Sequence, residues 1–161
     1  MLRFREIVVA FFADIRKMYQ TVMTTPEERH LRRVLWRSMD TSREPDVYII
    51  TCNNFGSGPA GAVTIATLRY LADLKRTELP RAAGTITNQS YVDDLIDSVD
   101  QYDAAVKITE VVDTILALGN FEVKKWSPIN STDLTGTSNA TISDCVPHFT
   151  ADSDSDSRFS V

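Results

Sequence analysis

The run Ile7–Ala13 constrains the fold of this chain more than any other stretch. All of its residues are apolar, and most are β-branched or aromatic. Such a run is typical of a strand that is buried on both faces. It is far shorter than the roughly 20 residues that a membrane-spanning helix needs. We therefore expect a buried strand that ends at Asp14, in a protein with no membrane partner.

Composition narrows the class of protein. The chain has 161 residues, 43% hydrophobic and 24% charged, which predicts one globular domain. A formal charge of -5 gives no general basic excess for binding nucleic acids, although arginines gather locally in segment 29–37. Cys52 and Cys145 lie far apart, which argues against a disulfide scaffold or a zinc cluster. Together with the lack of a secretory signal, this predicts a reduced, cytoplasmic protein.

The next part of the chain predicts a short helix followed by a hairpin. Thr25 stands at an N-cap, Pro26 follows at the first helical position, and Glu28 completes a capping box. Two strands, Val34–Trp36 and Asp46–Thr51, then flank a polar connection.

Two longer helices are predicted over 62–79 and 103–118. Their apolar stripes are Val63, Ala66, Tyr70 and Leu74 in the first helix, and Ala105, Ile108, Val112, Ile115 and Leu116 in the second. Pro80 is expected to end the first helix, and Gly119 to cap the second. Phe121–Trp126 alternates like a closing strand.

These elements predict an α+β fold, in which helices pack on one face of an antiparallel sheet. Residues 1–130 would form this domain. Residues 131–161 are rich in Ser, Thr, Asp and Asn, so we expect them to be a low-complexity, disordered tail.

The stretch NQSYVDDLIDSV places Asp93 and Asp94 between apolar residues. It reads equally well as a helix with a solvated acidic face or as an extended segment. If it is extended and next to the first strand, the acidic pair and Asp14 converge at one edge of the sheet. Three such carboxylates repel one another unless a cation neutralises them, and hard oxygen ligands suit Mg2+. Taken alone, Asp14 also fits an ordinary strand-end or turn carboxylate.

Tyr91-Val-Asp-Asp94 resembles the YxDD box of reverse transcriptases, which sits at a hairpin turn in the palm subdomain. The longer stretch SYVDDLIDSVD around this box and five further segments follow the order and spacing of polymerases from Pao/Bel-type LTR retrotransposons: ADIRKMYQ, LWR, PDVYIIT, FGSGPAGAVTIATLRYLAD and GNFEVKKW. The resemblance covers about residues 3–130. It favours the hairpin over the helix and implies a reverse-transcriptase-like palm.

The resemblance implies an RNA-directed DNA polymerase, a nucleotidyltransferase. Asp14, Asp93 and Asp94 would hold two Mg2+ ions, which Mn2+ can replace, and the backbone carbonyl of Ile15 would complete the metal site. Two-metal carboxylate sites transfer nucleotidyl groups by in-line displacement. The partners implied are an RNA or DNA template with its primer, and deoxynucleoside triphosphates.

The resemblance also implies substrate contacts. Tyr19 falls on the steric gate that rejects a ribose 2′-OH, although a plain core aromatic is the alternative. Phe55-Gly56 would contact the incoming nucleotide and the template through its backbone. Lys124 or Lys125 would match the lysine proposed to protonate pyrophosphate, the alternative for each being a solvated lysine on a strand face.

Parts of the polymerase pattern are not matched. Many relatives place a proline five residues after the glycine of the Phe-Gly pair, whereas this chain has Gly61 there and Pro59 earlier. Only thirteen residues precede Asp14, and no thumb or RNase H segment is recognised. We therefore expect a palm fragment with partial fingers, with the rest of a polyprotein as a further partner. The alternatives are a catalytically inactive remnant, associated with nucleic acid or another protein, and an unrelated α+β domain with acidic turns.

Overall fold

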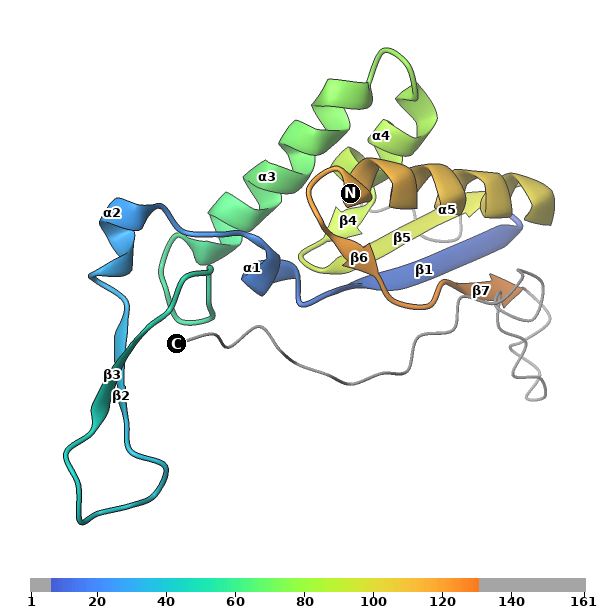
Figure 1. Cartoon of the computed structure of the whole chain (residues 1–161). Helices are drawn as coiled ribbons and strands as arrows, with labels where there is room; N and C mark the ends of the chain where they lie inside the picture. The colour runs from blue at the N-terminus through green and yellow to red at the C-terminus, as the bar shows by residue number, and fades with distance from the viewer. Residues whose placement is uncertain (1–6, 131–161) are drawn as a thin grey trace.

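A five-stranded antiparallel sheet forms the centre of the molecule in the computed structural model, which describes residues 7–130 (Figure 1). Strand β1 (Val9–Arg16) pairs on one side with β5 (Asp94–Val99), which in turn pairs with β4 (Ser90–Tyr91). Along its other side β1 pairs with β6 (Glu122–Val123) and then with β7 (Ser127–Asn130). Every pairing is antiparallel, as expected.

Helices cover one face of this sheet. Helix α3 (Ala60–Lys75), α4 (Pro80–Asn88) and α5 (Tyr102–Ala117) pack against one another, and α5 lies along β1 and β5 (Figure 1). Two four-residue helices, α1 (Met18–Thr21) and α2 (Pro26–Arg29), follow β1. The predicted α+β class is therefore confirmed. No helix within residues 7–130 is both long enough and apolar enough to cross a bilayer.

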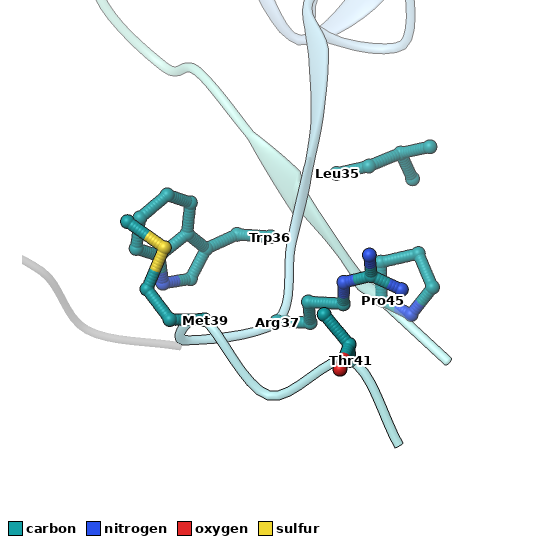
Figure 2. Close-up of a pocket in the computed structure, with 6 residues that line it drawn as sticks. All are labelled: Leu35, Trp36, Arg37, Met39, Thr41 and Pro45. Atoms are coloured by element: carbon teal, nitrogen blue, oxygen red, sulfur yellow. The ribbon is translucent and has the colours of Figure 1, made fainter. Parts of the chain in front are cut away.

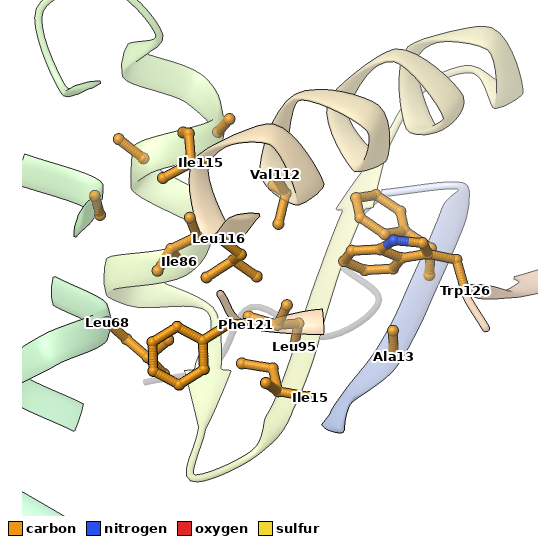
Figure 3. Packing of buried hydrophobic residues seen from close by; sticks show 14 of the residues in the cluster. Ala13, Ile15, Leu68, Ile86, Leu95, Val112, Ile115, Leu116, Phe121 and Trp126 are labelled. Carbon is orange, nitrogen blue, oxygen red and sulfur yellow. The ribbon is translucent and has the colours of Figure 1, made fainter. Parts of the chain in front are cut away.

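The hydrophobic core lies between the helices and the sheet (Figure 3). Leu95 from β5, Val112 and Leu116 from α5, and Phe11 from β1 are all fully buried there. Trp126 closes one end of the core and packs edge-on against Phe11, with ring centroids 5.7 Å apart. Edge-to-face contacts of this kind stabilise aromatic pairs beyond the apolar area that they bury.

The burial of β1 differs from the prediction. Val9, Ala10 and Phe11 are buried in succession, but beyond them burial alternates: Ala13 and Ile15 are buried, whereas Phe12 on the other face is 40% exposed. The strand also continues past Asp14 to Arg16. Burial on both faces therefore holds only for residues 9–11 and fails from Phe12 onward, because the described helices cover a single face of the sheet. We call the other face, which carries Phe12, Asp14 and Asp94, the open face.

Helix α3 forms where it was expected, but with a different buried face. Val63, Tyr70 and Leu74 are exposed, whereas the buried face carries Ala60, Thr64, Leu68, Leu71 and Ala72. Thr64 can be buried because its hydroxyl donates to the carbonyl of Ala60 and accepts from Asn53 Nδ2. The predicted apolar stripe was wrong because a sequence pattern counts threonine as polar. It could not show that hydrogen bonds allow Thr64 to be buried.

Pro80 starts a helix that was not predicted. It stands at the first position of α4, where its missing N–H is harmless. Helix α5, in contrast, buries the predicted stripe, with Ile108 half-buried and Thr109 added. Its predicted glycine cap was wrong, since the left-handed residue is Asn120, with φ 57°. Gly119 instead has the Leu71 side chain where its own Cβ would lie.

The predicted hairpin is present, but it stands apart from the main sheet. Strands β2 (Arg33–Trp36) and β3 (Asp46–Ile49) pair antiparallel as a separate two-stranded sheet that projects from the body of the molecule (Figure 1). All eight strand residues are exposed. Near the tip, an open hollow of about 370 Å³ is lined by Leu35, Trp36, Arg37, Met39, Thr41 and Pro45 (Figure 2).

Two smaller predictions also change. Thr25 is the N-cap of α2, but no side chain forms the expected capping bond, so the capping box is absent. The closing strand is limited to Glu122–Val123, and pairing with β1 resumes only at Ser127. Residues 124–126 therefore form an irregular link beside β1. The predicted tail, residues 131–161, lies outside the described part of the chain.

Candidate active site on the open face

The two adjacent acids lie on a hairpin, not on a helix. Strands β4 and β5 are joined by the turn Val92–Asp93, and Asp94 begins β5 opposite Tyr91. Val92 has a φ of 54°, a left-handed conformation that β-branched residues rarely adopt. Such strain typically costs about 1–3 kcal/mol and persists only where the surrounding structure imposes it. Of the two readings of this stretch, the extended one is correct.

Asp14 and Asp94 are direct partners on neighbouring strands. The backbone N–H of Ile15 donates to the carbonyl of Asp93 at 2.8 Å. The adjacent pair Asp14–Asp94 therefore occupies a non-hydrogen-bonded position, where opposed side chains approach most closely. Like charges at such a position destabilise a sheet. The register thus brings Asp14, on the central strand, next to Asp94, with Asp93 at the adjoining turn.

A lysine flanks this pair from the other side of β1. The backbone N–H of Lys124 donates to the carbonyl of Asp14 at 2.8 Å, and its Nζ lies 2.9 Å from Asp14 Oδ1. This oxygen is buried and accepts no hydrogen bond of good geometry among the described residues. The contact with Lys124 is therefore an ion pair without hydrogen-bond alignment. A buried carboxylate oxygen in this state is unusual in folded proteins.

The pKa of Asp94 reflects both the burial of this residue and the negative charges near it. Burial raises this pKa above its usual value, and the charges of Asp93 and Asp14 raise it further. The ammonium of Lys124 acts in the opposite direction. The three carboxylates and the lysine therefore form one electrostatic unit.

The donor chemistry of this unit fits a hard divalent cation. Carboxylate oxygens are the ligands that Mg2+ prefers, and Asp14 Oδ1 lacks a hydrogen-bond donor. No group of three or more His, Cys, Asp or Glu side chains within residues 7–130 is arranged to hold a metal ion as the side chains stand. Asp14, Asp93 and Asp94 would have to reorient to share one, with Lys124 displaced.

Two of the predicted substrate residues contact each other. The rings of Tyr19, on α1, and Phe55 lie with centroids 4.5 Å apart and planes tilted by 40°. Phe55 is 68% exposed, whereas Tyr19 is half-buried against the core. Tyr19 thus has core contacts and also faces the exposed Phe-Gly loop. Gly56 has a φ of 91°, which L side chains rarely adopt, so this loop requires glycine there.

The remaining predicted residues are Ile15 and the two adjacent lysines. The side chain of Ile15 is buried in the core, so only its backbone is available to a ligand. Lys125 is exposed, and it forms no ion pair with any residue of the described range. Both lysines lie between β6 and β7, so neither is on a strand face. Of the two, the structure brings only Lys124 to the carboxylates.

Sequence reasoning missed a buried carboxylate behind this site. Asp97, which is 3% exposed, lies in the stretch whose helical interpretation placed its acidic residues on a solvated face. Its Oδ2 accepts hydrogen bonds from Thr85 Oγ1 and Arg81, each at 2.6 Å, and its Oδ1 accepts from the backbone N–H of Ser98. This network ties α4 to β5, the strand that carries Asp94. The only signal in the sequence was the spacing of Arg81 and Thr85 one helical turn apart.

No model of a protein family matches this chain, and no curated protein matches it either.

Proposed function

We propose that this chain is the palm fragment of an RNA-directed DNA polymerase from a Pao-type retrotransposon, acting in the cytoplasm. The reaction would be nucleotidyl transfer from a deoxynucleoside triphosphate to a primer 3′-OH on an RNA or DNA template. The observation that carries the proposal is the register of β1 and β5, which sets Asp14 opposite Asp94 with Asp93 at the adjoining turn. The family itself rests on the sequence resemblance.

The arrangement supports this chemistry through the roles it allows each residue. Asp14, Asp93 and Asp94 would hold two Mg2+ ions, or Mn2+, which when bound supply activation of the attacking hydroxyl and stabilisation of the departing oxygen. The carboxylates also gather negative charge at one end of the sheet, and a bound cation would relieve their repulsion. Lys124 stands beside them as a proton donor or a countercharge.

The aromatic pair supports selection of the sugar. Tyr19 is held at the start of α1, five residues after Asp14, and packs against Phe55. A ring fixed by such packing keeps one position, which is what exclusion of a 2′-OH requires. Gly56 keeps the adjacent backbone free of a side chain, so a nucleotide could approach it closely.

A second candidate function is that of an inactive palm remnant with an interaction role. The observation that favours it is the β2–β3 hairpin, whose apolar side chains Leu35, Trp36 and Val47 are exposed without a covering layer among residues 7–130. A two-stranded hairpin of this kind is marginally stable alone in water. A partner, such as the rest of a polyprotein, would cover it.

Primer extension separates the two candidates. The purified chain is incubated with an annealed RNA template and DNA primer, Mg2+ and deoxynucleotides, beside Asp93→Asn and the control Asp100→Asn. Asp100 is exposed and lies beyond the end of β5. Extension by the unmodified chain and by Asp100→Asn, abolished in Asp93→Asn, supports the polymerase. Three folded proteins without extension support the remnant.

A further inference from the structure

The geometry points to Lys124 as a built-in competitor of the metal ion, whose ammonium pairs with Asp14 Oδ1 and must leave that oxygen before Asp14 can bind a divalent cation. This inference rests on the proposed function, because it concerns the same carboxylates. It adds a regulatory role to a residue that the proposed function uses only as a proton donor or a countercharge.

Lys124 is anchored to β1 through its backbone. Its backbone is bonded to the backbone of Asp14 at 2.8 Å, so the two residues are fixed opposite each other across β1 and the link that follows β6. From this anchor, Nζ reaches to 2.9 Å from Oδ1. The sheet therefore fixes the distance between the two backbones, and the long side chain of Lys124 spans the rest of the way to the carboxylate.

Lys124 contacts a buried carboxylate oxygen of Asp14. Asp14 Oδ1 is buried and has no hydrogen-bond donor within the described range. The same oxygen would be a ligand if Asp14 binds a metal ion. Because it is buried, little room is left around it for two cationic partners, and an ammonium and a metal ion placed there would also repel each other. Occupation by one therefore opposes occupation by the other.

The opposed carboxylates of Asp14 and Asp94 need a positive charge nearby. Asp14 and Asp94 are opposed at a position where like charges destabilise the sheet. In the absence of a metal ion, Lys124 supplies the neutralising charge, and its ammonium also acts on Asp94. It thereby holds the acidic end of β1 and β5 together until a stronger cation arrives.

Lys124 can move away from Asp14 easily. Its side chain is 56% exposed, it is long and flexible, and the ion pair has no hydrogen-bond alignment. Exposed pairs of this kind are weak, so their loss changes an equilibrium by only about two- to fivefold. The competition is thus strong enough to measure and weak enough for a divalent ion to overcome.

Binding of Mn2+, followed by electron paramagnetic resonance of the free ion, tests the inference. The full chain is compared with Lys124→Met and with Lys125→Met, a matched control that removes the neighbouring exposed charge. We expect Lys124→Met to lower the dissociation constant for Mn2+ about two- to fivefold, and Lys125→Met to change it much less. Lys124→Arg, which keeps the charge, should bind Mn2+ less tightly than Lys124→Met.

Three outcomes are distinguishable. Tighter binding confined to Lys124→Met supports the competition. Equal affinities in the unmodified chain, Lys124→Met and Lys125→Met, with binding lost in Asp14→Asn, overturn the competition but leave the metal site of the proposed function intact. No Mn2+ binding by any folded variant overturns both. Circular dichroism of each variant verifies the fold, and both lysines are exposed, so their replacement leaves the core unchanged.

Discussion

Asp14 and Asp94 face each other on adjacent antiparallel strands, at a position where no backbone hydrogen bond joins the two residues directly. Their carboxylates are therefore neighbours on the open face of the sheet. An ordinary structural sheet avoids two like charges in this relation, because they repel without any compensating contact. The pairing of Asp14 with Asp94 is physically reasonable if a cation beside them offsets their repulsion.

Replacement of Asp94 by asparagine should stabilise the metal-free protein. Because the pKa of Asp94 is raised in the folded state, its ionised form opposes folding, and this penalty is present at pH 7. We expect Asp94→Asn to raise the free energy of unfolding by about 0.5 kcal/mol at neutral pH, in EDTA. The gain should vanish near about pH 3, where both forms of the protein carry a neutral side chain.

Urea denaturation at the two pH values measures this effect, with Asp100→Asn as the exposed control. A loss of stability in Asp94→Asn at pH 7 would show that the carboxylate makes favourable contacts that exceed the repulsion from Asp14 and Asp93.

Asp113 should make stability fall as the pH rises through mildly acidic values. Burial raises its pKa to about 6, while the hydrogen bond that Trp126 Nε1 donates to it at 3.0 Å lowers it and Glu110 raises it slightly. Since this exceeds the unfolded value of 3.8, the folded state holds the proton more tightly. Stability is therefore highest below about pH 4 and declines until the carboxyl is ionised above about pH 6.

Asp113→Asn should remove this dependence, because the amide oxygen still accepts the bond from Trp126. At pH 8 we expect the variant to be more stable by about 1 kcal/mol, less than the full value of the shift, because the Asp113 carboxyl is only partly buried and solvent reaches the residue. Trp126 fluorescence, measured in a Trp36→Phe background, should titrate with a midpoint near about 6. A flat profile in the unmodified chain would contradict the prediction.

Arg81 should matter more to stability than other surface arginines. Its guanidinium pairs with Asp97, which is almost fully buried, so Arg81→Met leaves a buried carboxylate short of its countercharge. We expect a loss of about 2 kcal/mol, reduced from the value for a fully buried pair because the arginine is half exposed. The matched control is Arg76→Met, whose exposed pair with Asp73 should contribute under about 0.5 kcal/mol.

Chemical denaturation of both arginine variants provides the measurement. The midpoint should shift for Arg81→Met with an unchanged slope, which indicates a change in stability without a change in the extent of unfolding. Equal shifts for the two variants would mean that Asp97 is satisfied by Thr85 and Ser98 without the arginine.

Local patterns predicted several elements correctly, and each success has a physical reason. The stripe of α5 is long and strongly periodic, so its buried face follows directly from the positions of Val112 and Leu116. The hairpin of β2 and β3 follows from two apolar runs on either side of a polar turn. In the stretch containing Asp93 and Asp94, periodicity left helix and hairpin open, and only the resemblance chose correctly.

The failures share a different cause. The face of α3 depended on Asn53, which lies in the irregular loop leading into the helix and donates a hydrogen bond to the hydroxyl of Thr64. The exposure of Phe12 depended on the presence of helices on only one side of the sheet. Helix α4 began at a proline that, read locally, only ends the preceding helix. Each of these requires knowledge of what packs against the residue.

For the candidate site, the sequence by itself determined the chemistry available: three carboxylates, two lysines, an aromatic residue and a Phe-Gly pair at characteristic spacings. The tertiary structure alone decided that Asp14 opposes Asp94 and that Lys124, not Lys125, reaches the carboxylate. The reason is physical. Residue type and local periodicity are properties of short segments, whereas the register between strands and the contacts of β1 on both edges arise only when segments far apart in the chain pair.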